Sequence, residues 1–153
     1  GHLTVVPGGH PCSCGKRGCL ETYVSVDSAM KYLLANGVEV DSIAEFAMSF
    51  DATDTHMEAW IADGLEPFRN AINALENLFG PQTIMIGGNA PDWMIGAFMS
   101  RLEPLLPSIG HIERKLPRIM KSDLGADAVA RGAAVLPILA TLNPQYRNLN
   151  PYA

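Results

Sequence analysis

The sequence predicts an α/β domain. Long segments with helical periodicity alternate with two short apolar segments, 83–89 (TIMIGGN) and 116–122 (LPRIMKS), which are typical of buried strands. The chain has 153 residues, of which 48% are hydrophobic, and this is enough for one domain with a sizeable core. Two strands are too few for a self-sufficient sheet, so we expect further strands upstream of Gly1.

The first two helices are predicted over 20–37 and 41–50. In the first, apolar residues recur at helical spacing, and the pair Asn36-Gly37 provides a C-cap. The second helix opens with Ser42 and Glu45, which have the spacing of a capping box.

The longest helix is predicted over 55–79. Pro67 is expected to kink or break it, because proline has no backbone N–H to donate. Apolar residues follow steps of four and three along the helix and are predicted to be core without a cofactor role: Ile61, Leu65, Phe68, Ile72, Leu75 and Phe79.

Two further helices are predicted, one after each strand. The segment 90–106 has Pro91 suited to its first turn. The segment 123–142 is rich in small residues on one side, so we expect it to pack closely. The polar, proline-containing tail 143–153 is predicted to be a loose or surface-bound end.

The composition narrows the class of function. A net charge of −5 without a basic run makes the chain a poor candidate for binding nucleic acid by itself. No apolar run reaches membrane-spanning length and no signal peptide is present, so we expect a cytoplasmic protein without a membrane partner. The chain does not begin with Met, and we expect a fragment or a processed product.

All three cysteines lie in the segment HPCSCGKRGCLE, residues 10–21, in the pattern C-x-C-x4-C. An odd, clustered set argues against a disulfide framework and favours a metal in a reducing compartment. Gly15 and Gly18 would let the loop fold back, so that Cys19 joins Cys12 and Cys14. The alternative is three unmetallated surface thiols, which we disfavour because such a density of exposed thiols invites oxidation.

A structural zinc site takes four ligands, commonly three cysteines and one histidine. Two histidines compete for the fourth place: His10 is two residues before Cys12, and His2 is ten before it. Spacing alone does not choose between them, although the turn at 7–9 could return His2 to the loop.

The glycine pair after the first strand, Gly87-Gly88, is a weak signal. Glycine lets a ligand approach the backbone, and a helix N-terminus favours anions. A tight turn is the commoner reason for such a pair, and the chain contains neither a P-loop motif nor a dinucleotide-binding motif.

Residues 1–25, GHLTVVPGGHPCSCGKRGCLETYVS, resemble the signature of the ROK family of repressors, open reading frames and sugar kinases. The pattern is Gly-His, ten residues from that His to the first Cys, then C-x-C-G-x-x-G-C-L-E. The later segments IMIGG and LGADAVARGAA resemble nucleotide-side motifs of the family. The resemblance implies that 1–153 is the C-terminal part of an actin-like (ribonuclease H-like) ATPase-type domain. It would comprise a structural zinc loop over 2–21, an α/β lobe over 22–142 and the tail.

The resemblance also implies the roles of individual residues. His2 is the fourth zinc ligand, beside Cys12, Cys14 and Cys19, and its second ring nitrogen faces a sugar hydroxyl. Glu21 binds sugar hydroxyls, although an acid in the first turn of a helix is a common structural feature. A sugar or sugar phosphate is the expected ligand, Gly87 and Gly88 lie on the nucleotide side, and the protein is expected to be a homo-oligomer.

Other parts of the family pattern would lie before Gly1: the acid of E-x-G-H, the phosphate loop and the general-base Asp. No catalytic residue is therefore expected in this chain, which alone should phosphorylate nothing. The parent would be either a sugar-responsive regulator, whose upstream winged helix-turn-helix contacts DNA, or an ATP-dependent sugar kinase.

The regulator is favoured by two departures from the kinase pattern. Where kinases of the family read A-S-G after C-L-E, this chain reads TYVSVDSAM, with Val26 in place of that glycine. It also has GGN at 87–89 where kinases commonly have three glycines. A third reading is a zinc-stabilised domain that has lost sugar binding and only oligomerises.

Overall fold

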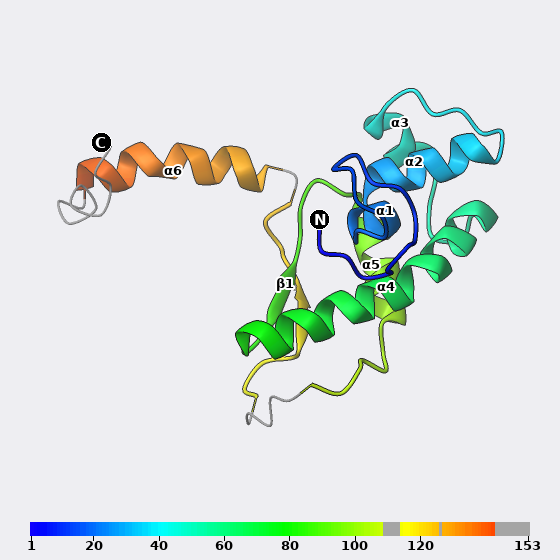
Figure 1. The fold of residues 1–153 in the computed structure, drawn as a ribbon. Coiled ribbons are helices and arrows are strands. Elements are labelled where there is room, and N and C mark those ends of the chain that lie inside the picture. Colours follow the sequence, from blue (N-terminus) through cyan, green and yellow to red (C-terminus); the bar gives the residue numbers. More distant parts are fainter. Residues whose placement is uncertain (109–113, 126, 143–153) are drawn as a thin grey trace.

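The computed structural model describes residues 1–108, 114–125 and 127–142 (Figure 1). Four helices come first, and from the fourth helix onward helices and strands alternate as predicted. The elements are α1 (Glu21–Val24), α2 (Val26–Ala35), α3 (Ile43–Ser49), α4 (Thr55–Phe79), β1 (Ile84–Ile86), α5 (Asp92–Arg101), β2 (Ile119–Lys121) and α6 (Ala128–Leu142). The two strands form a parallel sheet in which Ile84 lies opposite Ile119. The tail 143–153 lies outside the described residues.

The helix predicted over 20–37 is two helices, α1 and α2, which meet at Ser25. Ser25 has an extended backbone, and its side chain accepts a hydrogen bond from the Ser28 N–H as the N-cap of α2. This break resets the helical phase: in α2, Leu33 is fully buried whereas Leu34 is 60% exposed. Gly37 follows the predicted C-cap Asn36 with a φ of +82°.

The starts of α3 and α4 are fixed by side-chain caps. Ser42 accepts a hydrogen bond from the Glu45 N–H, as the capping-box spacing predicted. The Glu45 carboxylate accepts a hydrogen bond from the Asp41 N–H, one residue earlier than the motif expects. Asp54 caps α4 by accepting from the N–H groups of His56 and Met57.

The long helix α4 has the predicted bounds and is the central element of the core. It runs through Pro67 without interruption, so the expected break is absent. Ile61 and Ile72 are fully buried as predicted, whereas Phe79 is 75% exposed in the last turn. Aromatic contacts join α4 to α5, since Phe98 packs edge-on against both Trp60 and Phe68.

A buried ion pair attaches the sheet to α4. The Glu76 side chain is almost fully buried, and the Arg118 Nε donates to its Oε1 at 3.0 Å. An Arg114 guanidinium nitrogen lies 3.1 Å from the same oxygen. Both arginines shortly precede β2 in the chain, so this carboxylate fixes the second strand against the helix.

The helix predicted over 90–106 ends earlier, at Arg101. Pro91 is the N-cap residue of α5 rather than part of its first turn. Pro104 restricts the backbone before it, which disfavours a longer helix. Leu102 and Leu105 are nevertheless buried and pack with Ile72.

The expected close packing of the last helix is wrong for the described residues. None of the residues of α6 is buried, and Val129 is 83% exposed. Figure 1 shows α6 extending away from the other elements. Small residues permit close packing only where a partner surface is available, and no described residue supplies one. No helix of the described chain combines the length and apolar character needed to cross a membrane.

Candidate functional site

The metal loop, residues 1–20, places His2 beside the cysteines through backbone pairing. The Leu20 N–H donates to the Leu3 carbonyl, and the Glu21 N–H donates to the Gly1 carbonyl, each at 2.9 Å. Thr4 and Cys19 form an isolated antiparallel bridge. The segment that carries His2 therefore lies alongside the segment that begins at Cys19.

Gly18 is required by the fold of this loop. Its φ is +76°, and a Cβ at this position would lie 1.6 Å from the Val6 carbonyl oxygen. Gly15 also has a positive φ, +84°. The prediction that these glycines let the loop fold back is confirmed.

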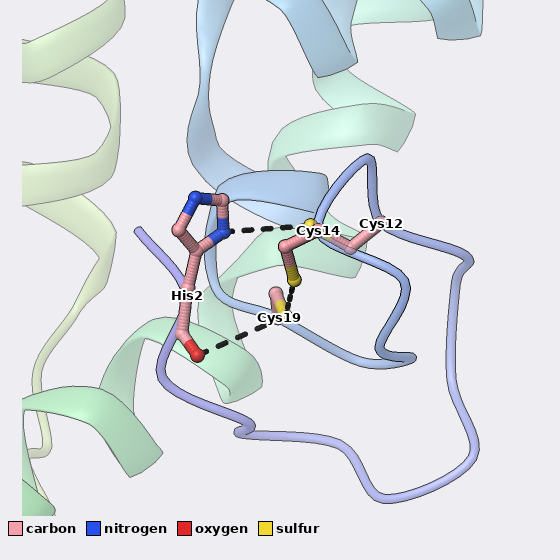
Figure 2. A group of neighbouring side chains, drawn as sticks. All are labelled: His2, Cys12, Cys14 and Cys19. Carbon is pink, nitrogen blue, oxygen red and sulfur yellow. Dashed lines mark hydrogen bonds between the residues drawn. The ribbon is translucent and has the colours of Figure 1, made fainter.

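His2, Cys12, Cys14 and Cys19 form a group that could hold a metal ion. Their potential ligand atoms all lie within 4.8 Å of one another. Cys14 Sγ is 3.7 Å from Cys19 Sγ, and His2 Nδ1 is 3.5 Å from Cys12 Sγ, as Figure 2 shows. A tetrahedral zinc ion with ordinary bond lengths separates two sulfurs by about 3.8 Å, and a sulfur from a nitrogen by about 3.6 Å. The group is therefore compatible with zinc.

The second candidate ligand, His10, lies elsewhere. Its ring stacks on the Tyr23 ring with centroids 4.6 Å apart, and its backbone N–H donates to the Tyr23 hydroxyl. The structure thus brings His2, and not His10, to the three thiols.

The thiols differ in their surroundings. Burial, followed by the nearby Cys14 and Cys12 sulfurs, raises the pKa of the Cys19 thiol to about 11. A hydrogen bond from the Lys16 backbone, partly offset by desolvation, lowers the pKa of Cys14. A cation at the centre of the group would favour the thiolate of each cysteine, so metal binding would release protons.

Sequence reasoning missed the contribution of Lys16. Its Nζ donates to the His2 carbonyl at 2.8 Å, which anchors the backbone of the histidine. The only signal was a lysine between the second and third cysteines, and many unrelated loops share that feature.

Glu21 lies at the edge of the metal group. Its Oε2 is 3.7 Å from His2 Nδ1, and its Oε1 accepts from the Ser13 hydroxyl at 3.5 Å. The carboxylate is partly exposed, so it remains accessible to a ligand. Glu21 is also the first residue of α1, but α1 has four residues and offers little dipole for an acid to stabilise.

Gly87 and Gly88 follow β1 at the carboxyl end of the parallel sheet, where open α/β sheets commonly bind ligands. A Cβ on Gly87 would lie 2.7 Å from the Ser122 Cβ, so the close approach of the segment after β2 already explains this glycine. A Cβ on Gly88 would meet nothing within 4 Å, but its φ is +142°.

The sequence of this chain is similar to those of known proteins. The profile of the ROK family matches residues 1–139. The glucokinase of Halalkalibacterium halodurans is 34% identical over 104 residues, which are 58% of this chain and 31% of that protein. The DNA-binding transcriptional repressor Mlc of Escherichia coli (strain K12) is 35% identical over 100 residues, which are 57% of this chain and 24% of that protein.

Among solved structures, the ROK hexokinase from Thermus thermophilus is similar with a TM-score of 0.65 and 29% identity. The match covers 92% of this chain and 47% of that chain. This likeness supports the actin-like ATPase-type fold that the sequence resemblance implied. The chain spans less than half the length of each of these three proteins.

Proposed function

The chain belongs to the ROK family, and we propose that it is the sugar-sensing effector part of a transcriptional regulator of that family. In this proposal a sugar or sugar phosphate binds at His2 and Glu21 and modulates operator binding by an upstream winged helix-turn-helix. The observation that carries the proposal is the position of the partly exposed Glu21 carboxylate beside His2 and the metal group.

Zinc has a structural role in this proposal. His2, Cys12, Cys14 and Cys19 would hold the ion, which supplies four strong bonds to a loop with few buried residues. By fixing the loop, the site would orient the His2 ring and the nearby Glu21 carboxylate toward a ligand. A metal-bound histidine commonly directs its other ring nitrogen to an oxygen partner, and a sugar hydroxyl would be that partner here.

The regulator is favoured over a kinase by the residues after Glu21. Val26 stands where kinases of the family have a glycine, and it is the first residue of α2, directly after the cap Ser25. A winged helix-turn-helix upstream would supply the contacts to DNA. We also propose that the protein is a homo-oligomer, since the exposed Leu78 and Phe79 leave apolar surface at the end of α4.

The second candidate is the C-terminal half of an ATP-dependent hexose or amino-sugar kinase. The similarity to the glucokinase and the ROK hexokinase favours it. In this case Gly87 and Gly88, at the carboxyl end of β1, would approach the nucleotide, and the general base would come from the other lobe.

The sugar-binding role is tested by Glu21→Gln in the full-length protein that carries this chain. We expect the variant to retain zinc and its melting temperature but to bind sugar about tenfold more weakly. The reason is that a hydrogen bond to a charged carboxylate contributes roughly 1.5–3 kcal/mol. Isothermal titration with glucose and N-acetylglucosamine measures the affinity.

The matched control is Glu39→Gln, which makes the same chemical change at an exposed residue that does not line the metal loop. It should leave sugar affinity unchanged. If Glu21→Gln also leaves it unchanged, Glu21 is only an acid at the start of a helix and the sugar-sensing assignment is wrong.

A further inference from the structure

A cavity of about 310 Å³ lies between the metal loop, α2 and α4. Ser13 lines it on the side of the loop and Glu21 at the start of α1. Tyr32 lines it on the side of α2, and Trp60 and Asp63 on the side of α4. Its volume falls at the lower end of the range for pockets that bind small molecules. Because Glu21 lines it, the cavity begins at the carboxylate to which we assign the sugar.

The walls combine one accessible flat ring with hydrogen-bonding groups. The half-buried Tyr32 offers apolar ring surface. Trp60 is only 3% exposed and packs edge-on against Phe98, so it closes the cavity on the side of α4. The Asp63 carboxylate has no hydrogen-bond or ion-pair partner among the described residues, so it can accept hydrogen bonds from a ligand. A pyranose ring has the matching surfaces, since its C–H groups can pack on a ring while its hydroxyls donate to carboxylates.

The charge of the cavity argues against a phosphorylated ligand. Three carboxylates line it, those of Glu21, Asp27 and Asp63. Among the described lining residues, the one ammonium or guanidinium group is Lys31, whose Nζ already pairs with Asp27 at 2.6 Å. His10 also lines the cavity, with its ring stacked on Tyr23. A phosphate placed here would meet no unpaired ammonium or guanidinium group and would be repelled by the carboxylates.

We propose that this cavity is a second subsite, which binds the further ring of an uncharged disaccharide or glycoside whose first ring is held at Glu21. The ligand class of the protein is then a two-ring neutral sugar in preference to a monosaccharide or a sugar phosphate. This inference rests on the proposed sugar-binding role of Glu21.

The subsite is tested with a variant that fills it. Ala35 lines the cavity, is exposed and ends α2, so Ala35→Trp should block the space without disturbing the core. The matched control is Ala62→Trp, which adds the same side chain at an exposed position of α4 that does not line the cavity. A milder variant, Asp63→Asn, keeps the shape of the cavity and removes one charged acceptor.

Binding of glucose, glucose 6-phosphate, maltose, cellobiose and gentiobiose is measured by titration of the full-length, zinc-loaded protein. We expect at least one disaccharide to bind about tenfold more tightly than glucose, and glucose 6-phosphate to bind more weakly than either. Ala35→Trp should remove the disaccharide preference and leave glucose affinity within about twofold. Asp63→Asn should weaken the disaccharide alone, and Ala62→Trp should change neither.

These measurements distinguish a failure of the subsite from a failure of the proposed sugar-binding function. If glucose binds as tightly as every disaccharide, or if Ala35→Trp leaves the preference intact, the subsite is refuted while sugar sensing stands. If the zinc-loaded protein binds none of these sugars, the proposed function fails and the subsite fails with it.

Discussion

Cys14→Ser is expected to lower the zinc content from one ion per chain to a small fraction and to lower the melting temperature by about 5–15 °C. Because the free energy of zinc binding is coupled to folding, the loss of a zinc ligand lowers the stability of the folded state. Cys14 Sγ lies 3.7 Å from Cys19 Sγ, and no other described side chain in the loop completes the group of four. Elemental analysis of reduced protein and a thermal melt of the same sample measure both quantities.

Ser13→Ala is the matched control for this prediction, because Ser13 lies in the same loop but contributes no ligand. It should keep the full zinc content. Wild-type protein without zinc, or a Cys14→Ser variant that retains it, would contradict the assignment of the metal site.

Glu76→Gln is expected to reduce the free energy of unfolding by roughly 3–5 kcal/mol. Removing one partner of a buried ion pair leaves the other charges without compensation. Here the substitution would leave the guanidinium groups of Arg114 and Arg118 without a carboxylate partner and would remove the contact that holds β2 against α4. Urea denaturation followed by circular dichroism gives the difference. Glu66→Gln removes the exposed partner of an ion pair with Arg69 on the same helix and should cost less than about 1 kcal/mol.

The pH dependence of this difference follows from the lowered pKa of Glu76. The hydrogen bond from Arg118 lowers it most, against the opposing effect of burial, and the charges of Arg118 and Arg114 lower it further. A carboxylate with a lowered folded-state pKa stabilises the fold fully above its unfolded-state pKa, about 4.3. The stability gap between wild type and Glu76→Gln should therefore be constant from pH 6 to 8 and shrink as the pH falls below about 4. A gap that does not shrink would show that the charge of Glu76 is not its source.

Local patterns in the sequence were enough to predict much of the fold. Steps of three and four gave the bounds of α4, and the Ser42 cap is read from adjacent residues. The clustered cysteines and the two loop glycines similarly pointed to a folded-back loop, because every partner lies within a short segment.

Features that depend on distant contacts could not be predicted in this way. The break at Ser25 interrupts a pattern of apolar residues that reads as continuous, and it is seen in the extended backbone of Ser25 and the exposure of Leu34. Glu76 is buried because arginines about forty residues later neutralise it, although a charge four positions after Ile72 on the apolar stripe was a usable signal. The exposure of α6 depends on which surfaces are present to cover it, and composition does not report that.

The candidate site was likewise only partly predictable. Spacing left His2 and His10 as equal candidates for the fourth ligand, and the backbone pairing of residues 1–4 with 19–21 separates them. The cavity beside Glu21 joins the metal loop to Trp60 and Asp63 on α4, residues that periodicity could describe only as part of a helix.

Whether this chain serves a sugar-responsive regulator is tested most directly by DNA binding of the full-length protein, measured by fluorescence anisotropy with and without sugar. DNA fragments selected from the protein's own genome serve as probes. We predict tight, sequence-specific binding to at least one fragment, which sugar weakens by about tenfold or more, and no such weakening in Glu21→Gln. A protein that binds no fragment specifically, yet transfers phosphate from ATP to a hexose, would contradict the regulator and establish the kinase in its place.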